Sequence, residues 1–375
     1  MEKIPFREFH ILKLLSEYTI SSLPLDAAIY RYFKLHKALG SKDRYEISET
    51  CYALVRWQGL LDALGREKIW TERLRIYQQD QWRTKGKALP PHIRCSFPED
   101  LFKRISNTFG EEGAFKLCLA CNSPAPTCIR VNTLKISRDE LLNRWKDQFN
   151  ISPTQHSPDG IIFKQKIHFY SLPEFQKGLF EMQDEASQLV AKLIKALPGE
   201  HVLDYCAGAG GKALAIAPSL QGKGQLYLHD VRAHALTEAK QRLRRAGVQN
   251  IQTLQEGHPS LNKLKKKMDW VLVDAPCTGT GTLRRNPDMK WRYSDEMLER
   301  LLGQQRMIFE KALSYMHPEG HIVYATCSLL NEENEQQLEH FLRVYDLVVE
   351  GTPLKTIPKE GEMDGFFGVV LKRRV

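Results

Sequence analysis

The sequence predicts an α/β protein in which a doubly wound sheet is preceded by a small α+β module and an N-terminal helical bundle. Three regions with different hydrophobic patterns support this prediction. Helical periodicity fills the first 90 residues, short alternating strands follow residue 97, and apolar strands alternate with amphipathic helices after residue 183. At 375 residues the chain is long enough for about two or three domains. We therefore expect domains at 1–90, 97–182 and 183–375.

The first region reads as a small bundle of helices. Apolar residues recur at three-to-four spacing over Phe6–Tyr18, Leu25–Leu39 and Tyr45–Leu64. The polar, basic stretch Gln78–Lys87 follows and leads to Pro90-Pro91. Because proline blocks both helix and strand continuation, this stretch is predicted to be a linker.

The second region mixes one long helix with short strands. Glu99–Cys121 is predicted to be helical, and Thr127–Asn132 and Ile161–Phe163 alternate like strands around a helix at Ser137–Trp145. The region contains a single CxxC pair, Cys118 and Cys121. No second pair or histidine cluster follows at zinc spacing, so helical packing is favoured over a metal site.

The third region alternates strands with helices in the order typical of a doubly wound sheet. The main helices are predicted at Ala233–Ala246 and Ser294–Met316. The predicted strands are His201–Tyr205, Gln225–His229, Ile251–Leu254, Trp270–Asp274 and His321–Ala325.

Composition favours a cytoplasmic protein. Hydrophobic residues make up 42% and charged residues 26% of the chain, which is a globular balance. The first sixteen residues carry charges throughout, so we expect no export signal and no membrane span. The 8 cysteines are then expected to be reduced thiols rather than a disulfide framework.

The formal net charge of +9 has two interpretations. Short basic runs are usually solvated helix faces, but their recurrence late in the chain favours a polyanionic partner such as RNA. A membrane surface is not expected, because no strongly amphipathic basic helix accompanies the charge. The clusters are Arg242 with Arg244 and Arg245, Lys263 with Lys265 to Lys267, Arg284 with Arg285, and Lys372 to Arg374.

A glycine-rich turn follows the first strand of the predicted sheet. Cys206-Ala207-Gly208-Ala209-Gly210-Gly211-Lys212 leads directly into a helix, where glycines let the backbone approach a ligand closely. Asp230 ends the next strand, 19 residues (230 − 211) beyond the last glycine, where a carboxylate can accept ribose hydroxyls. The pattern indicates a nucleoside-containing cofactor and leaves nicotinamide and S-adenosylmethionine both open.

Two later strands end in residues that carry chemistry. The run at 269–274 ends at Asp274 and continues into Ala-Pro-Cys277, and the last predicted strand leads to Cys327. If these two strands are neighbours, about 5 Å apart, both thiols and the carboxylate converge beside the cofactor cleft. One buried cysteine is commonly a packing residue, but two thiols and a carboxylate at one edge favour catalysis.

Methylation of cytosine at carbon 5 needs such a set. This carbon is a poor nucleophile until a thiolate adds to C6 and makes C5 an enamine carbon. A carboxyl group that protonates or hydrogen bonds N3 stabilises the developing charge. Loss of the C5 proton and of the thiolate then restores aromaticity.

The chain resembles the RNA cytosine-C5 methyltransferase family. The likeness covers roughly residue 97 to the C-terminus and implies a Rossmann-like methyltransferase sheet with S-adenosylmethionine as cofactor. The motifs that carry it are the 206–212 loop, Asp274-Ala-Pro-Cys-Thr-Gly-Thr-Gly281, Arg285-Asn-Pro-Asp288, Thr326-Cys-Ser328, Arg130-Val-Asn-Thr-Leu134, Gln183-Asp-Glu-Ala-Ser187 and Met363-Asp-Gly-Phe-Phe367.

The resemblance implies a role for each site residue. Cys327 is expected to be the nucleophile, Cys277 to assist product release, and Asp274 and Lys212 to take part in catalysis. Two positions depart from the usual pattern, since Glu256 stands where aspartate is common and Ala209 where proline is common. The residues expected to bind the cofactor are Cys206, Ala207, Gly208, Ala209, Gly210, Gly211, Lys212, Asp230, Glu256 and Asp274.

The first region carries a second, shorter likeness. Gly40-Ser-Lys-Asp-Arg44 followed by Glu49–Arg56 resembles the NusB-like RNA-binding domain of bacterial 16S rRNA methyltransferases of this family. It implies 16S rRNA or a small-subunit assembly intermediate as the partner, with no metal and no obligate protein partner. The alternatives are the same chemistry on tRNA, a noncatalytic RNA-binding assembly factor, and a NAD-dependent dehydrogenase, which would leave both thiols unexplained.

Overall fold

The computed structural model describes residues 4–79, 81–165 and 167–374. The chain forms two compact units, which are described separately. One contains the chain up to Pro124 together with Thr282–Asp295, and the other contains Ala125–Gly281 and the chain from Glu296 onward. No helix among the described residues is both long and apolar enough to cross a membrane.

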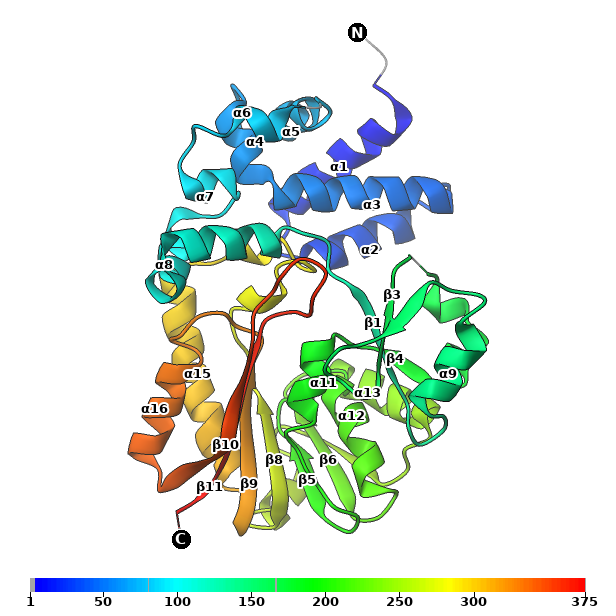
Figure 1. Cartoon of the computed structure of the whole chain (residues 1–375), viewed down its shortest axis with the longest axis vertical. Helices are drawn as coiled ribbons and strands as arrows, with labels where there is room; N and C mark the ends of the chain where they lie inside the picture. The colour runs from blue at the N-terminus through cyan, green and yellow to red at the C-terminus, as the bar shows by residue number, and fades with distance from the viewer. Residues whose placement is uncertain (1–3, 80, 166, 375) are drawn as a thin grey trace. The chain divides into compact units, whose positions relative to one another are not determined.

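A seven-stranded sheet forms the centre of the second unit, with strand order β10-β11-β9-β8-β5-β6-β7 (Figure 1). The five strands from β9 to β7 in this order are parallel, and β11 and β10 add to β9 in antiparallel fashion. The predicted doubly wound sheet is therefore confirmed, with two additional strands. The bounds are β5 (His201–Asp204), β6 (Gln225–Asp230), β7 (Ile251–Gln255), β8 (Met268–Asp274), β9 (Met316–Thr326), β10 (Leu347–Thr356) and β11 (Phe366–Arg373).

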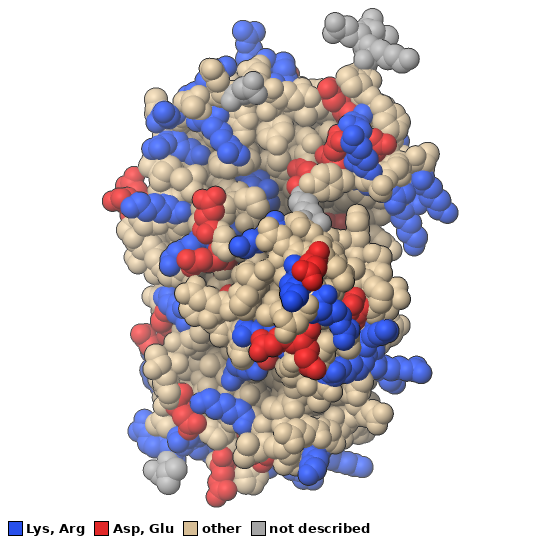
Figure 2. Space-filling model, turned by 45° about the vertical axis from the view of Figure 1, so that its right-hand side comes forward, with Lys and Arg blue, Asp and Glu red and all other residues tan. Residues whose placement is uncertain are grey.

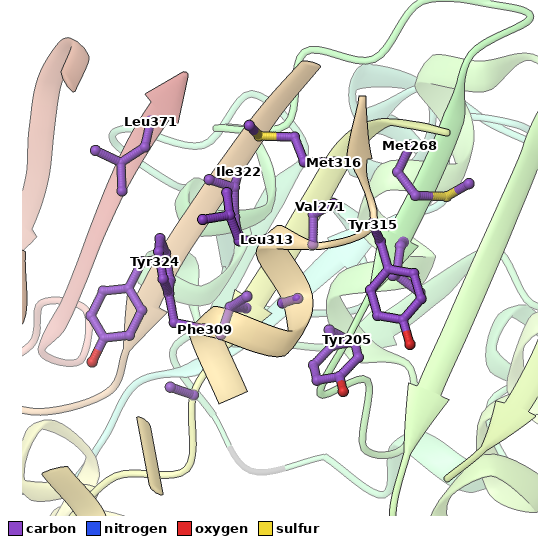
Figure 3. Close-up of a cluster of buried hydrophobic side chains, with 14 of the residues drawn as sticks. Tyr205, Met268, Val271, Phe309, Leu313, Tyr315, Met316, Ile322, Tyr324 and Leu371 are labelled. Carbon is purple, nitrogen blue, oxygen red and sulfur yellow. The ribbon is translucent and has the colours of Figure 1, made fainter. Parts of the chain in front are cut away.

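Two apolar cores lie on the two faces of this sheet. On one face α12 and α13 bury alanine and leucine against the strands. On the other, α14, α15 and α16 pack on a cluster that includes Phe309, Tyr324 and Leu371 (Figure 3). Since both faces are covered, the parallel strands read as nearly continuous apolar runs. The helices are α11 (Glu185–Ala191), α12 (Gly211–Leu220), α13 (Ala233–Ala246), α14 (Ser260–Lys263), α15 (Asp295–Leu313) and α16 (Glu335–Val344).

A small antiparallel sheet of order β2-β3-β1-β4 precedes the large one, and confirms the predicted α+β module. Helix α9 begins with a capping box, in which Ser137 and Glu140 exchange hydrogen bonds, and packs through Trp145 on the sheet. The elements are β1 (Thr127–Val131), α9 (Arg138–Trp145), β2 (Ile151–Pro153), β3 (Gly160–Phe163), a 3₁₀ turn (Phe169–Ser171), α10 (Pro173–Gln176) and β4 (Phe180–Met182).

The first unit is helical, as predicted, but two details differ. The predicted helix Tyr45–Leu64 is interrupted at Trp57, and the predicted linker Gln78–Lys87 contains α6, whose Trp82 is buried against Trp57. The buried Trp82 side chain packs this segment onto the helical unit, although its polar residues alone had indicated a linker. The helices are α1 (Phe6–Ile20), α2 (Leu25–Leu35), α3 (Ser41–Arg56), α4 (Gln58–Leu64), α5 (Trp70–Tyr77), α6 (Trp82–Lys85), α7 (Pro91–Arg94) and α8 (Glu99–Cys121).

Helix α8 shows what the CxxC pair does in the structure. Cys118 and Cys121 lie on this helix with their side chains buried, as the packing interpretation expected. By its contacts α8 belongs to the first unit, although the sequence grouped it with the α+β module. The assignment of functional domains to 1–90, 97–182 and 183–375 stays a prediction.

The segment 282–295 returns from the Cys277 loop into the helical unit. Lys290 is fully buried there and donates hydrogen bonds to the Arg56 carbonyl (2.7 Å) and to Asn122 Oδ1 (2.9 Å). Trp291 donates to the Val55 carbonyl at 2.7 Å. These contacts lie more than 160 residues apart in sequence, so no local pattern predicted them. The helical unit is therefore completed by chain from the later part of the sequence.

Candidate active site

The candidate site residues meet at one edge of the large sheet. Strands β5, β6, β7, β8 and β9 are parallel, so the residues that follow them share the carboxyl edge. The register pairs Asp274 with Ala325, two residues before Cys327, and Asp230 with Gln255, one residue before Glu256. The expected neighbourhood of the two cysteine-bearing strands is confirmed. The order of connection reverses between β5 and β8, where α/β sheets bind their ligands.

The glycine loop lies between β5 and α12. Gly208 (φ 52°) and Gly210 (φ 77°) adopt left-handed backbone conformations, which favour glycine. Gly210 is the N-cap of α12, so the first amides of this helix face the loop. The Ala207 amide donates to the His229 carbonyl at 2.9 Å, and the Ala209 carbonyl accepts from Arg242 at 2.8 Å. These bonds hold the loop although alanine replaces the usual proline.

Asp230 lies at the end of β6 with its side chain 5% exposed. It accepts from the Gly208 amide (2.8 Å) and from the amide and guanidinium of Arg232 at 2.8 to 3.1 Å. Burial opposes ionisation, but these hydrogen bonds hold the pKa of Asp230 below its ordinary value. The Arg232 side chain is 58% exposed. The ribose of a cofactor can therefore replace the Arg232 guanidinium on the Asp230 carboxylate if Arg232 turns outward.

Glu256 follows β7 and lies near Asp230 along the same edge. Its carboxylate contacts His229 Nε2 at 3.1 Å and Lys311 Nζ at 3.3 Å. The His229 ring in turn stacks on Tyr205, with centroids 4.4 Å apart. Partial burial opposes ionisation, and Lys311 and His229 more than compensate, so the pKa of Glu256 is lowered. Glutamate at this position is thus an ionised acceptor.

Asp204 is a site residue that the sequence reasoning did not single out. It ends β5 two residues before the glycine loop, is 1% exposed, and among the described residues lies near the Cys206 amide without a well-aligned hydrogen bond to either carboxylate oxygen. Burial and the neighbouring Asp274 raise the pKa of Asp204 to about 7. A buried carboxylate without well-aligned donors is costly unless a ligand supplies them. The available signal was an acidic residue at the strand end, two residues before the loop motif.

Asp274 and Lys212 form an ion pair at the carboxyl edge of the sheet. The Lys212 Nζ to Asp274 Oδ2 distance is 2.5 Å, with the side chains 9% and 30% exposed. Burial disfavours the ammonium, but the Asp274 carboxylate outweighs this and raises the pKa of Lys212. Lys212 also lies over the Phe366 ring, 5.2 Å from its centroid. The site therefore holds a fixed positive charge beside a carboxylate.

The two candidate catalytic cysteines lie in contact. Cys277 Sγ and Cys327 Sγ are 3.4 Å apart, and both side chains are partly exposed. The hydrogen bond to Cys327, together with burial, raises the pKa of Cys277 well above its ordinary value. The two sulfurs are within hydrogen-bonding distance, and either thiol can donate to the other.

Gly281 joins three loops of the site. Its amide donates to the Cys327 carbonyl at 2.9 Å, and its carbonyl accepts from the Gly365 amide at 3.0 Å. A Cβ atom here would lie 2.0 Å from the Gly365 carbonyl oxygen and 2.9 Å from that of Cys327. Only glycine fits such an approach. The Met363–Phe367 motif thus supports both cysteine loops, a role that its sequence did not reveal.

The basic clusters are not all solvated cations. Arg242 and Arg245 pair with the buried Glu181, and Arg284 is itself buried. Lys265 to Lys267 precede β8 and Lys372 to Arg374 end the antiparallel β11, so both groups lie at the edge of the sheet opposite the cysteines. The face seen in Figure 2 mixes basic and acidic side chains. The basic clusters therefore lie in different places, and several of their side chains are paired or buried.

A doubly wound sheet with a glycine-rich loop on one side of its switch point and an acidic strand end on the other is typical of methyltransferases. Comparisons with known proteins agree with this class. Residues 191–372 match the family model "16S rRNA methyltransferase RsmB/F", and residues 97–169 match the ferredoxin-like domain of the same proteins. The chain belongs to the RsmB/F family of 16S rRNA methyltransferases.

Individual relatives support the assignment. Ribosomal RNA small subunit methyltransferase B of Photorhabdus laumondii is 34% identical over 289 residues, which cover 74% of this chain and 66% of the relative. The protein of the same name from Vibrio vulnificus is 30% identical and covers 98% of this chain and 83% of its own length. The crystal structure of a protein called PH0851 shares the fold, with a TM-score of 0.82, 22% identity and 99% coverage of both chains.

Proposed function

We propose that this protein transfers a methyl group from S-adenosylmethionine to carbon 5 of a cytosine in 16S rRNA, through a covalent adduct between Cys327 and C6. The observation that carries the proposal is the 3.4 Å contact between Cys277 Sγ and Cys327 Sγ at the same sheet edge as the Lys212–Asp274 pair. Family membership and the names of the relatives support 16S rRNA as the substrate.

The residues around the glycine loop fit S-adenosylmethionine. Asp204 offers a buried carboxylate without well-aligned donors, which suits the cationic amino group of the methionine part. Asp230 and Glu256 offer ionised acceptors for ribose hydroxyls, and the loop amides can approach closely. When bound, the cofactor supplies a methyl group activated on a sulfonium sulfur.

Cys327 performs the first covalent step. The target cytosine must leave its stack, at a cost of a few kcal/mol, before C6 is accessible. The Cys327 thiolate then adds to C6, and the electron pair displaced from the C5–C6 double bond makes C5 nucleophilic. After methylation of C5, loss of its proton and cleavage of the S–C6 bond restore the aromatic base. The Cys277 thiol stabilises the departing thiolate through the hydrogen bond between the two sulfurs.

Asp274 and Lys212 act on the ring while the adduct forms. Addition of the thiolate moves negative charge onto the ring, toward N3 and O2. To donate at N3 the Asp274 side chain needs a proton, and the adjacent Lys212 ammonium can supply it, so the pair can deliver a proton as negative charge develops on the ring. Their pairing means that neither group needs to reorganise as the charge develops.

Bisulfite mapping of rRNA and tRNA tests the substrate. RNA from cells with and without this protein is compared, and one 16S rRNA cytosine is expected to lose protection when the protein is absent. Loss of protection confined to tRNA would favour the same chemistry on tRNA. Unchanged protection in both RNAs would favour the noncatalytic assembly factor. The remaining alternative, a NAD-dependent dehydrogenase, is disfavoured because it gives the two adjacent thiols no function.

Replacing Asp230 with alanine is expected to weaken binding of S-adenosylmethionine about 10- to 100-fold. Hydrogen bonds to a charged group contribute roughly 1.5 to 3 kcal/mol, and the ribose hydroxyls lose theirs. Arg232→Ala is the matched control and should bind at least as tightly as wild type, since Arg232 occupies the carboxylate. Calorimetry measures both. Equal affinity of Asp230→Ala and wild type would exclude the ribose contact.

RNA binding is expected to weaken steeply with salt, because the basic side chains behind the +9 net charge neutralise phosphates and release counterions.

Replacement of Lys265, Lys266 and Lys267 by glutamine should leave kcat/KM for RNA within about threefold, since exposed charges act weakly beyond a Debye length. Filter binding over a salt series and initial-rate assays give the two quantities. A dissociation constant that is independent of salt would contradict the electrostatic contribution.

A further inference from the structure

One buried carboxylate links the two loops that carry the catalytic cysteines. Glu333 lies between β9 and α16, and its side chain is fully buried. Its Oε1 accepts from the Thr278 amide and from Gln305 Nε2, both at 2.9 Å. Its Oε2 accepts from the hydroxyls of Thr278 and Ser328, both at 2.5 Å. Thr278 directly follows Cys277, and Ser328 directly follows Cys327.

Neighbouring groups complete the same network. Gln305, on α15, donates through the same amide to the Pro276 carbonyl at 3.0 Å, directly before Cys277. Thr280 accepts from the Leu329 amide at 2.8 Å and contacts Ser328 at 3.2 Å. Each cysteine loop is therefore tied to the carboxylate directly and through a second hydrogen bond.

Burial of a carboxylate in this network costs free energy of desolvation. Its donors are neutral, and no ion pair with Glu333 is present in the part of the chain that the structure describes. Burial raises the pKa of Glu333, and the hydrogen bonds from Ser328, Thr278 and Gln305 oppose that effect. A buried polar group of this kind is often neutral or unfavourable for stability compared with an apolar replacement. The carboxylate binds the residues that directly follow Cys277 and Cys327, so a role beyond stability accounts better for its presence.

We propose that Glu333 is a positioning residue that ties the Cys277 and Cys327 loops together and so holds the two sulfurs in contact for adduct formation and release. This inference rests on the proposed function for its catalytic meaning. The tie itself is a geometric statement that requires neither RNA nor cofactor. Chemical bridging of the two sulfurs therefore tests the tie independently of whether cytosine is methylated.

Two substitutions separate position from charge. Glu333→Gln keeps the shape, and its amide can accept from the Thr278 amide and Gln305 while it donates to the two hydroxyls, which are also acceptors. Glu333→Ala removes the four hydrogen bonds to the carboxylate and leaves the bonds that join the two loops directly, from the Leu329 amide to Thr280 and from the Gly281 amide to the Cys327 carbonyl. We expect Glu333→Gln to retain the sulfur contact and Glu333→Ala to lose it.

Phenylarsine oxide measures the sulfur contact directly in the full-length protein. The arsenic bonds to two adjacent thiols, and its oxygen leaves as water with both thiol protons. Mass spectrometry of peptides identifies the bridged cysteines, and Cys277→Ala is the control that cannot be bridged. Wild type and Glu333→Gln should be bridged at Cys277 and Cys327 at similar rates, whereas Glu333→Ala should react about tenfold more slowly or not at all.

A pH profile separates positioning from a general structural role. The hydrogen bond with Cys327, burial and the nearby Glu333 charge raise the pKa of Cys277. Glu333→Gln removes that charge, so alkylation of Cys277 by iodoacetamide should begin at lower pH than in wild type. A loss of packing alone would not produce this shift in a variant with an unchanged melting temperature.

Bridging of a folded Glu333→Ala at the wild-type rate would overturn the proposal, and so would failure of wild type to be bridged at these two cysteines. If Glu333→Ala does not fold, Ser328→Ala replaces it, because this variant removes one tie to the Cys327 loop. Slower bridging in Ser328→Ala supports the proposal, and an unchanged rate contradicts it.

Discussion

Replacement of Cys327 by alanine is expected to abolish both methylation of RNA and the covalent RNA adduct. Without this sulfur no bond to C6 forms, and C5 does not become nucleophilic. By analogy with other nucleophile substitutions, the loss should be roughly 10⁴-fold or more. Initial-rate methyl transfer and denaturing electrophoresis measure the two effects. Cofactor affinity should be unchanged, which serves as the control for folding.

Cys277→Ala should give a different result with the same substrates. The adduct can still form at Cys327, but the departing thiolate loses the hydrogen bond from the neighbouring sulfur. Elimination is then slowed, and protein linked to RNA should accumulate and survive denaturing electrophoresis. A trapped adduct with Cys327→Ala, but none with Cys277→Ala, would show that the roles of the two cysteines are reversed.

Replacement of Lys212 by methionine is expected to lower kcat/KM by about 10² to 10³-fold. The substitution leaves Asp274 without its partner at 2.5 Å and removes the cation that stabilises charge in the transition state. Lys212 lies in the first turn of α12, next to the glycine loop, so calorimetry must show how much of the loss arises from cofactor binding.

Lys192→Met provides a matched control for this prediction. Lys192 pairs with Asp159 at 2.6 Å, but its side chain is 44% exposed. Exposed ion pairs contribute roughly 0 to 1 kcal/mol, so activity should be nearly unchanged. Equal effects of Lys212→Met and Lys192→Met would contradict a catalytic role for the Lys212–Asp274 pair.

The sequence predicted the parallel part of the sheet because those strands are buried on both faces and read as apolar runs. It missed β10 and β11 for physical reasons. The β10 strand contains Gly351 and Pro353 at a register irregularity between Glu350 and Leu354, so it resembles a turn. Antiparallel addition at an edge also leaves no helix crossover that would have marked a further strand.

The site residues divide in the same manner. Asp274 and Asp230 end apolar strands, and Cys277 and Cys327 closely follow such strands, so parallel pairing alone predicted that they meet. Glu333 belongs to the acidic run at 332–335, which reads as a solvated helix start, and its burial comes from elements far away in sequence. The local sequence pattern predicts where a residue lies along a strand, but it does not predict which charged side chain, such as Glu333, becomes buried by tertiary packing.

Release of the C5 hydrogen is the most direct test of the central claim, which is methylation of cytosine C5 through a Cys327–C6 adduct. In 16S rRNA labelled with tritium at C5 of cytosine, wild-type protein and S-adenosylmethionine should release one tritium for each methyl group transferred. The Cys327→Ala protein should release none. Methyl transfer without tritium release would place the methyl group on another atom and contradict the claim.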